Sequence, residues 1–255
     1  MSPSDLAPAD RIVFISDCHL PPERTARTDL FTRFLREVCE GAGRLFVLGD
    51  LFSAWVGPRH VVEPGHAAAF AALQRLAESG TDVTLLRGNR DFQLDRRIAR
   101  RFGLHFVRGA WRGRLGGKTV RLSHGDELAE GDRFHKVTRA LSSNFPLSTL
   151  VKAMPLWASK KLADGYRWVS DHRHVQRNPK PPQPDTRRIR SKLEAGADLV
   201  IIGHWHKPAI EVDAFGLSGK TFIMLGECTE TKAYYAEMRG DSIELRTFTG
   251  PSNPQ

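Results

Sequence analysis

The feature that most constrains this chain is a series of short apolar segments that each end in a side chain able to bind a metal. In chain order, the residues that follow these five segments are Asp17 and His19, Asp50, Asn89, His124, and His204 and His206. Short apolar runs of this kind are typical of strands buried on both faces of a parallel sheet. In open α/β sheets, ligands bind at the carboxyl ends of the strands. The pattern therefore predicts an α/β fold in which the ends of separate strands build one site.

Helices are expected between these strands. Apolar residues recur at helical spacing over 28–41 and again after Pro64, and a basic helix is expected over 94–102. Asp185 is suited to cap a helix over 185–195. Three later segments are expected to form antiparallel strands of a second sheet: 220–225, 232–238 and 242–248.

The strand pattern is interrupted between residues 127 and 186. Helices are expected there over 132–141 and 147–163, and the proline-rich stretch 178–184 is expected to be a loop. The chain is therefore interpreted as one core with a helical insertion: residues 1–126 form the first part of the core, 127–186 the insertion and 187–255 the second part.

Composition limits the possible surroundings and partners. No apolar run approaches the roughly 20 residues that span a bilayer, and no secretory signal is visible, so a cytoplasmic location is expected. The net charge of +9 and the pI near 9.8 favour an acidic partner: a phosphorylated metabolite, nucleic acid or an anionic membrane face. Charge alone does not choose among them.

The ligand-type residues are too many for one tetrahedral zinc ion, which takes four ligands. They suit two ions about 3.5 to 4 Å apart that share a bridging carboxylate, for which Asp50 is the candidate. We expect one ion to be bound by Asp17, His19, Asp50 and His206, and the other by Asp50, Asn89, His124 and His204. The mixed nitrogen and oxygen donors favour Mn²⁺, Fe²⁺ or Zn²⁺ over Mg²⁺.

Strand geometry gives one reason for this convergence. Residues two apart in a strand point to the same side, so Asp17 and His19 can face one point while Cys18 turns away. By the same reasoning, Trp205 should face the core between His204 and His206.

These residues carry a family resemblance. The chain is similar to the calcineurin-like metallophosphoesterases in five motifs that occur in the same order: Asp17-Cys18-His19, Gly49-Asp50, Gly88-Asn89-Arg90-Asp91, His124-Gly125-Asp126 and Gly203-His204-Trp205-His206. The resemblance runs from about Arg11 to Pro208. It implies a four-layered αββα sandwich with a two-metal centre and the ligand roles given above.

Within that superfamily the chain most resembles the UDP-2,3-diacylglucosamine diphosphatases of lipid A synthesis, through the residues around these motifs such as Ala54-Trp55-Val56-Gly57 and Lys207-Pro208. The resemblance implies hydrolysis of a nucleotide-linked lipid to UMP and 2,3-diacylglucosamine 1-phosphate. It also implies manganese as the usual metal, a helical lid and a peripheral place on the cytoplasmic face of the inner membrane. The residues expected to act in catalysis are Asn89, Arg90 and His124, and those expected to contact substrate are Asn89, Arg90, Asp132 and His204, with Asp132 placed by the resemblance.

Arg90 gives a separate indication of the chemistry. Many superfamily members have a histidine there, which can protonate a leaving group, whereas a guanidinium stays charged and instead clamps phosphate oxygens. This favours a leaving group that needs little protonation, such as a nucleotide monophosphate with a second pKa of about 6. The alternative is that Arg90 only pairs with Asp91 or another carboxylate.

Other interpretations stay open. Ser53 and Pro58 stand where the diphosphatases carry acidic residues, and their polar lid residues are not recognisable over 166–184. A related enzyme acting on another nucleotide diphosphate or on a phosphodiester, a nuclease included, is therefore the alternative, although no basic and aromatic platform for stacking bases is visible. A non-catalytic scaffold would be expected to have lost ligands, and the insertion could be an ordinary helical cap. The histidines expected to serve only at the surface or in packing are His60, His66, His105, His135, His172 and His174.

Overall fold

The first sheet is built from the buried strands that the apolar segments predicted. The computed structural model describes residues 11–129, 145–176 and 183–250, except for the side chains of 145–148 and 169–176. The sheet has six strands in the order β11-β10-β1-β2-β3-β4. Its parallel part consists of β1 (Arg11–Ile15), β2 (Arg44–Val47), β3 (Asp82–Leu86) and β4 (His105–Val107), and its antiparallel part of β10 (Lys232–Arg239) and β11 (Ser242–Thr249).

The second sheet has five strands in the order β5-β6-β7-β9-β8. β6, β7 and β9 run parallel, and β5 and β8 are antiparallel edges. The strands are β5 (Trp111–Leu115), β6 (Lys118–Ser123), β7 (Leu199–Ile202), β8 (Ala209–Val212) and β9 (Thr221–Met224).

The expected grouping of the last strands was therefore wrong in part. Only β9 belongs to the second sheet, where it runs parallel to β7, and β8 was not anticipated. β10 and β11 instead extend the first sheet beyond β1. The reason is burial on both faces of β10: Ala236 and Met238 face the core between the sheets, while Ala233 and Tyr235 face the core under the helices.

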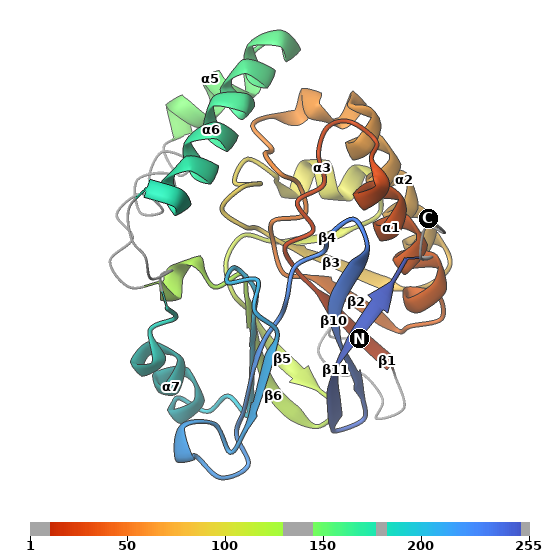
Figure 1. Ribbon diagram of the computed structural model, residues 1–255. Coiled ribbons are helices and arrows are strands. Elements are labelled where there is room, and N and C mark those ends of the chain that lie inside the picture. Colours follow the sequence, from red (N-terminus) through yellow and green to blue (C-terminus); the bar gives the residue numbers. More distant parts are fainter. Residues whose placement is uncertain (1–10, 130–144, 177–182, 251–255) are drawn as a thin grey trace, which may run out of the picture.

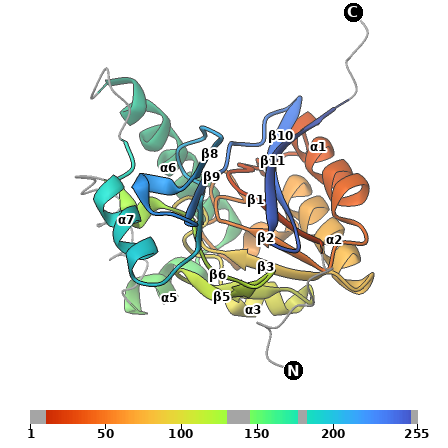
Figure 2. The same cartoon turned by 90° about the horizontal axis from the view of Figure 1, so that it is seen from below.

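Helices cover the outer faces of both sheets, which confirms the four-layered αββα architecture (Figures 1 and 2). α1 (Ala26–Phe34), α2 (Pro64–Glu78) and α3 (Arg96–Arg101) pack on the first sheet, and α7 (Thr186–Glu194) packs on the second. The helix expected over 28–41 begins earlier and ends in the π-helical turn η1 (Leu35–Cys39). The expected cap of α7 is confirmed, because the Asp185 carboxylate accepts hydrogen bonds from the Arg187 and Arg188 amides.

Alternation along β1 shows how one strand serves two cores. Val13 and Ile15 pack under α1 and α2, while Ile12 and Phe14 pack against the second sheet. A third core lies between the second sheet and α7. A rigid pair of sheets buried on both sides therefore holds the loops at their carboxyl ends.

The insertion contributes two helices, α5 (Phe145–Ala153) and α6 (Leu156–Gln176), at one end of the molecule (Figure 1). The single helix expected over 147–163 is broken at Met154-Pro155, because proline lacks the amide hydrogen that a helix interior needs. The helix expected over 132–141, and most of the loop 178–184, lie outside the described residues. Their role as a lid stays a prediction.

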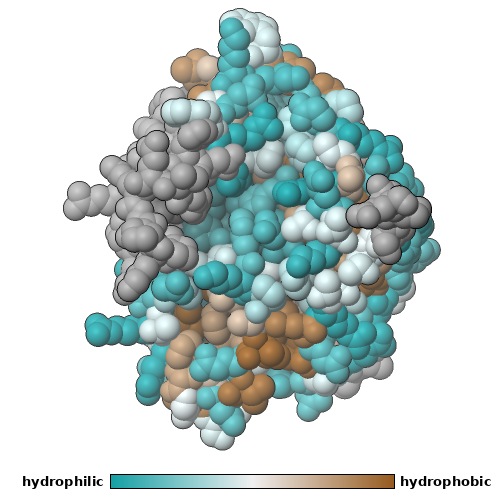
Figure 3. All heavy atoms as spheres, viewed as in Figure 1, coloured by the Kyte–Doolittle hydropathy of each residue, from teal (hydrophilic) through white to brown (hydrophobic). Residues whose placement is uncertain are grey.

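Three short 3₁₀ turns complete the described chain: η2 (Pro58–Val62), η3 (Asp126–Leu128) and η4 (Ala214–Gly216). The face seen in Figure 3 has a hydrophilic hollow at its middle, between the helices of the insertion and the strands. Within the described ranges, no helix is both long and apolar enough to cross a membrane.

Candidate metal centre

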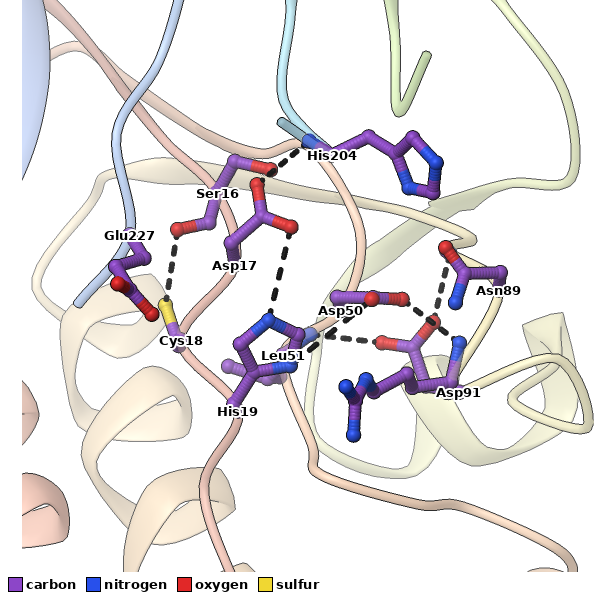
Figure 4. A network of polar contacts seen from close by, with 12 residues as sticks. Ser16, Asp17, Cys18, His19, Asp50, Leu51, Asn89, Asp91, His204 and Glu227 are labelled. Carbon is purple, nitrogen blue, oxygen red and sulfur yellow. Dashed lines mark hydrogen bonds and ion pairs between the residues drawn. The ribbon is translucent and has the colours of Figure 1, made fainter. Parts of the chain in front are cut away.

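Loops from both sheets bring the predicted ligand-type residues together. The first group lies around Asp17, whose Oδ1 atom is 3.8 Å from His19 Nε2 (Figure 4). The same Oδ1 atom is 3.3 Å from His206 Nε2. The two imidazole nitrogens are themselves 3.0 Å apart. Three donor atoms thus face one point, an arrangement that could hold a metal ion.

The second group lies around His124. Its Nε2 atom is 2.8 Å from Asn89 Oδ1, 3.2 Å from His204 Nδ1 and 3.6 Å from Asp50 Oδ1. The other oxygen of Asp50 is 3.9 Å from His19 Nδ1. One carboxylate therefore reaches toward both groups, as a bridging residue must, and Asp17, Asp50 and His124 also form a group that could hold an ion.

The backbone of these residues corrects the reason given for their convergence. β1 ends at Ile15, and Asp17 and His19 have φ angles of 53° and 46°, so strand alternation does not orient them. Left-handed backbone also occurs at Asp50, His204 and His206, with φ angles of 50°, 76° and 58°. Each such residue costs about 1 to 3 kcal/mol and is concentrated at functional sites in proteins. Local strain, imposed by the rigid sheets, aims these side chains.

Two glycines let the loops approach. A Cβ atom on Gly88 would lie 2.1 Å from Asp50 Oδ1, and one on Gly203 would lie 2.0 Å from Ser16 Oγ and 2.5 Å from Asp17 Oδ2. Any other residue at either position would displace a carboxylate of the site.

Several residues outside the predicted set orient the site. Asp91 is fully buried, and its two oxygens accept hydrogen bonds from the Gly88 and Leu51 amides at 2.7 and 2.9 Å. It thus ties the Asp50 loop to the Asn89 loop through two backbone amides.

Histidine orientation is fixed in the same way. His124 Nδ1 lies 2.9 Å from the Leu48 carbonyl, which favours a proton on Nδ1 and leaves Nε2 to face the centre. His206 Nδ1 lies 3.5 Å from Glu227 Oε2. Glu227 was missed in the sequence, although it follows the apolar segment of β9 and so repeats the pattern of the other strand ends.

The pKa values of the buried groups are set by a competition between burial and the neighbouring charges. Burial raises the pKa of Asp50 to about 7. Burial also acts to raise the pKa of Asp17, but contact with His206 and the charge of His124 outweigh it and hold that pKa well below its usual range. Burial lowers the pKa of His124, yet Asp50 and Asp17 together raise it to about 9.

Unpaired atoms indicate that a cation fits here. Asp17 Oδ1 and His19 Nδ1 are buried without a hydrogen-bond partner, and such atoms cost about 1 to 3 kcal/mol each when left unsatisfied. A divalent cation would satisfy carboxylate oxygen and imidazole nitrogen together.

The remaining predicted residues are placed as follows. The Arg90 amide donates to Asp50 Oδ1 at 2.8 Å, and burial together with the Arg90 charge keeps the pKa of His19 well below its usual value despite the nearby Asp17. Trp205 is half-buried against the core under α7, as expected. Asp132 and His135 lie outside the described residues, as do the side chains of His172 and His174. Of the other histidines, His60 and His66 are buried packing residues and His105 is exposed.

The ends of strands from two sheets thus present carboxylates and imidazoles grouped as in a centre for divalent metal ions. The sequence pattern of the calcineurin-like phosphoesterases matches residues 10–208, and the chain belongs to this family of metal-dependent hydrolases. Family membership confirms the resemblance and implies divalent metal ions.

More specific relatives carry one name. A UDP-2,3-diacylglucosamine hydrolase of Stenotrophomonas maltophilia is 38% identical over 230 residues, covering 86% of this chain and 91% of the relative. Those of Xanthomonas oryzae pv. oryzae and Escherichia coli are 34% and 31% identical, and each match covers 92% of this chain and 98% of the relative. Among solved structures, an archaeal phosphodiesterase has a TM-score of 0.49 at 11% identity, with 94% of this chain and 99% of that chain covered.

Proposed function

We propose that this chain hydrolyses the pyrophosphate of UDP-2,3-diacylglucosamine to UMP and 2,3-diacylglucosamine 1-phosphate. The observation that carries the proposal is the Asp50 carboxylate, which reaches toward two groups of donor atoms through separate oxygens. The substrate assignment is supported by the names of relatives that match the chain over most of its length.

The seven ligand-type residues have these proposed roles. Asp17, His19, Asp50 and His206 bind one divalent ion, and Asp50, Asn89, His124 and His204 bind the other. Manganese fits the mixed donors, with iron or zinc as alternatives. Bound ions of this kind supply an activated water and neutralise charge on the phosphoryl group. Because Nδ1 of His124 is engaged by the Leu48 carbonyl, Nε2 is the atom that would bind the ion, which would take the place of the Nε2 proton.

Arg90 acts on the phosphate rather than on the leaving group. Its backbone is fixed by Asp50 and by the Trp55 amide, which donates to the Arg90 carbonyl at 2.9 Å. A permanently charged guanidinium beside the metal centre stabilises negative charge as the pyrophosphate is cleaved. With Asn89, His204 and Asp132, it forms the proposed set of substrate contacts.

The insertion is proposed to shelter the acyl chains. It covers residues 127–186 between the two parts of the core. α5 and α6 expose large apolar side chains, namely Leu150, Trp157, Leu162 and Trp168. α6 also reaches the metal centre, since the Tyr166 hydroxyl donates to the Asn89 carbonyl at 2.9 Å. Exposed apolar side chains on helices that contact the loops of the site suit a lipid-linked substrate at the cytoplasmic face of the inner membrane.

The substrate is tested with a manganese-supplemented assay on four compounds: UDP-2,3-diacylglucosamine, a simple UDP-sugar, a generic phosphodiester and single-stranded DNA. Release of UMP from the lipid-linked compound alone is expected. Turnover of the simple UDP-sugar at an equal rate would replace the lipid assignment with a general nucleotide diphosphatase, and cleavage of DNA alone would establish a nuclease.

The metal centre is tested with Asp50→Asn, which removes the bridging charge at constant size. We expect turnover to fall by a factor of about 1,000 or more and manganese to fall below two ions per chain, because both ions lose the negative charge that they share. Asp29→Asn is the control, since Asp29 is exposed and pairs with Arg24 rather than with a ligand-type residue. Substantial activity in Asp50→Asn, or in excess chelator, would refute the two-metal centre.

A further inference from the structure

A cavity of about 80 Å³ lies beside His124. It shares Gly88 and His124 with the metal centre, and its walls continue onto β6 and onto the segment between β4 and β5. No described residue of α5 or α6 lines it. The apolar surface proposed for the acyl chains and this polar cavity are therefore built from different parts of the chain.

Two residues that line the cavity each carry a buried donor without a partner. Ser123 is 2% exposed, and its hydroxyl has no hydrogen-bond partner. The Nε atom of Arg121 is likewise buried and without a partner. The Arg121 guanidinium approaches Glu127 Oε1 only to 3.8 Å, which is too far for a hydrogen bond. Buried donors of this kind are rare in folded proteins unless a ligand or water completes them.

The cavity also has an excess of positive charge. Arg87, Arg108 and Arg121 contribute three guanidinium groups to its walls, against the two carboxylates of Asp126 and Glu127. Arg112 pairs with Arg121 in the β5–β6 register. Burial, followed by the charge of Arg112, lowers the pKa of Arg121, while the charge of Glu127 acts to raise it.

We propose that this cavity is a phosphate subsite that holds the second phosphate of the pyrophosphate while the first lies at the metal centre. This inference rests on the proposed function. A serine hydroxyl and an arginine Nε–H match the acceptor oxygens of a phosphate, and the volume admits one such group. Sharing His124 with the metal centre places the subsite next to the reacting phosphate.

The first test measures binding without the metal ions. Inorganic phosphate, UMP and 2,3-diacylglucosamine 1-phosphate are titrated calorimetrically into the full chain in excess chelator at about 0.15 M salt, where long-range charge effects are screened. We expect Arg121→Gln to raise the dissociation constant of phosphate about tenfold and Ser123→Ala about threefold. Arg112→Gln is the matched control, because Arg112 carries the same charge on the facing strand and does not line the cavity. This variant should change phosphate binding less than twofold.

The two phosphorylated products identify which half of the substrate supplies the phosphate. The product whose affinity falls in Ser123→Ala and Arg121→Gln is the one whose phosphate occupies the cavity. Equal binding of all ligands by wild type and both variants would overturn the subsite, as would loss of all phosphate binding from the wild-type chain when the metal is removed. If Arg121→Gln has a lowered melting temperature, Ser123→Ala decides the question.

Failure of the subsite and failure of the proposed function give different results. Hydrolysis of UDP-2,3-diacylglucosamine with unchanged KM in both variants would leave the function in place and remove the subsite. Phosphate binding that depends on Arg121, in a chain that does not hydrolyse this substrate, would leave the subsite in place and remove the substrate assignment.

Discussion

His66 is enclosed by aromatic side chains next to the Asp50 loop. Its ring centroid is 4.5 Å from that of Phe52 and 5.4 Å from that of Trp55, and the residue has no exposed surface. Nδ1 lies 3.0 Å from the His60 carbonyl, while Nε2 has no partner. Burial lowers the pKa of His66 from 6.5 to about 4, so the folded protein holds this imidazole neutral.

This pKa predicts a loss of stability on acidification. Between pH 6.5 and about 4 the unfolded chain binds a proton at His66 that the folded chain does not, so the contribution is fully present above pH 6.5 and declines as pH falls. Urea unfolding in chelator should show that wild type loses about 2 kcal/mol more than His66→Gln does between pH 7 and pH 5. Comparing the two proteins cancels the other titrating groups. An equal loss in both would show that His66 is not held neutral.

At this scale the sequence identifies donors better than it orients them. Asp17, His19 and Asp50 could be predicted as ligands because each follows an apolar segment, and this pattern depends only on residue types and their order. The left-handed backbone of these residues could not be predicted, because it arises from loops that are confined between two sheets. Glu227 was missed because the segment 220–225 was expected to be an antiparallel strand, whereas β9 runs parallel to β7 and ends beside the other ligand-bearing strands.

Helix α6 is fastened to the core by specific polar contacts. Besides the Tyr166 bond to Asn89, Lys160 Nζ lies 3.2 Å from Glu63 Oε2, and in α5 Lys152 Nζ lies 2.6 Å from Asp95 Oδ2. Apolar packing adds to them, since Ala163 is buried together with Ala54 and Val56. The helices of the insertion are thus positioned by the same loops that hold the metal centre.

Tyr166→Phe tests this connection. The variant keeps the ring and removes only the hydroxyl that fixes the Asn89 carbonyl. We expect kcat to fall about three- to tenfold, corresponding to about 1 kcal/mol, with the melting temperature nearly unchanged. Tyr234→Phe is the control, since it removes a hydroxyl that accepts a hydrogen bond from Lys232 on β10. A lower manganese affinity in Tyr166→Phe alone would locate the effect at Asn89; unchanged kcat and affinity would show that α6 acts independently of the centre.

Elements were predictable where a local signal existed. Five parallel strands follow from their apolar runs, and α7 follows from Asp185. The break at Pro155 carried a local signal as well, since proline does not fit a helix interior. The pairing of β10 with β1 had no such local signal. Alternation along a strand indicates which face is buried, but not which strand lies beside it.

At the scale of the whole molecule, positive charge and exposed apolar surface occur together. The chain has a net charge of +9. On α6, Trp157 and Trp168 are 67% and 63% exposed, and the Lys161 ammonium lies 5.8 Å from the centre of the Trp157 ring. Aromatic side chains beside basic ones are typical of surfaces that bind at the interface of an anionic membrane.

This surface predicts reversible binding to anionic vesicles. In sedimentation with vesicles containing about 30% anionic lipid, Trp157→Ser should lower the bound fraction severalfold, and higher salt should lower it further. Val212→Ser is the control, because Val212 is 69% exposed on β8, in a different part of the fold. Equal binding by both variants would mean that α6 does not face the membrane.

At the five ligand-type residues with left-handed backbone, the stability of the fold and the binding of metal favour different residues. Glycine at any of them would relieve the backbone and favour the folded state, yet it would remove a donor atom. A lineage released from catalysis would therefore gain stability by losing these side chains, and mutation alone would erode them. Replacing one of these side chains by glycine is therefore expected to weaken metal binding while the fold keeps or gains stability.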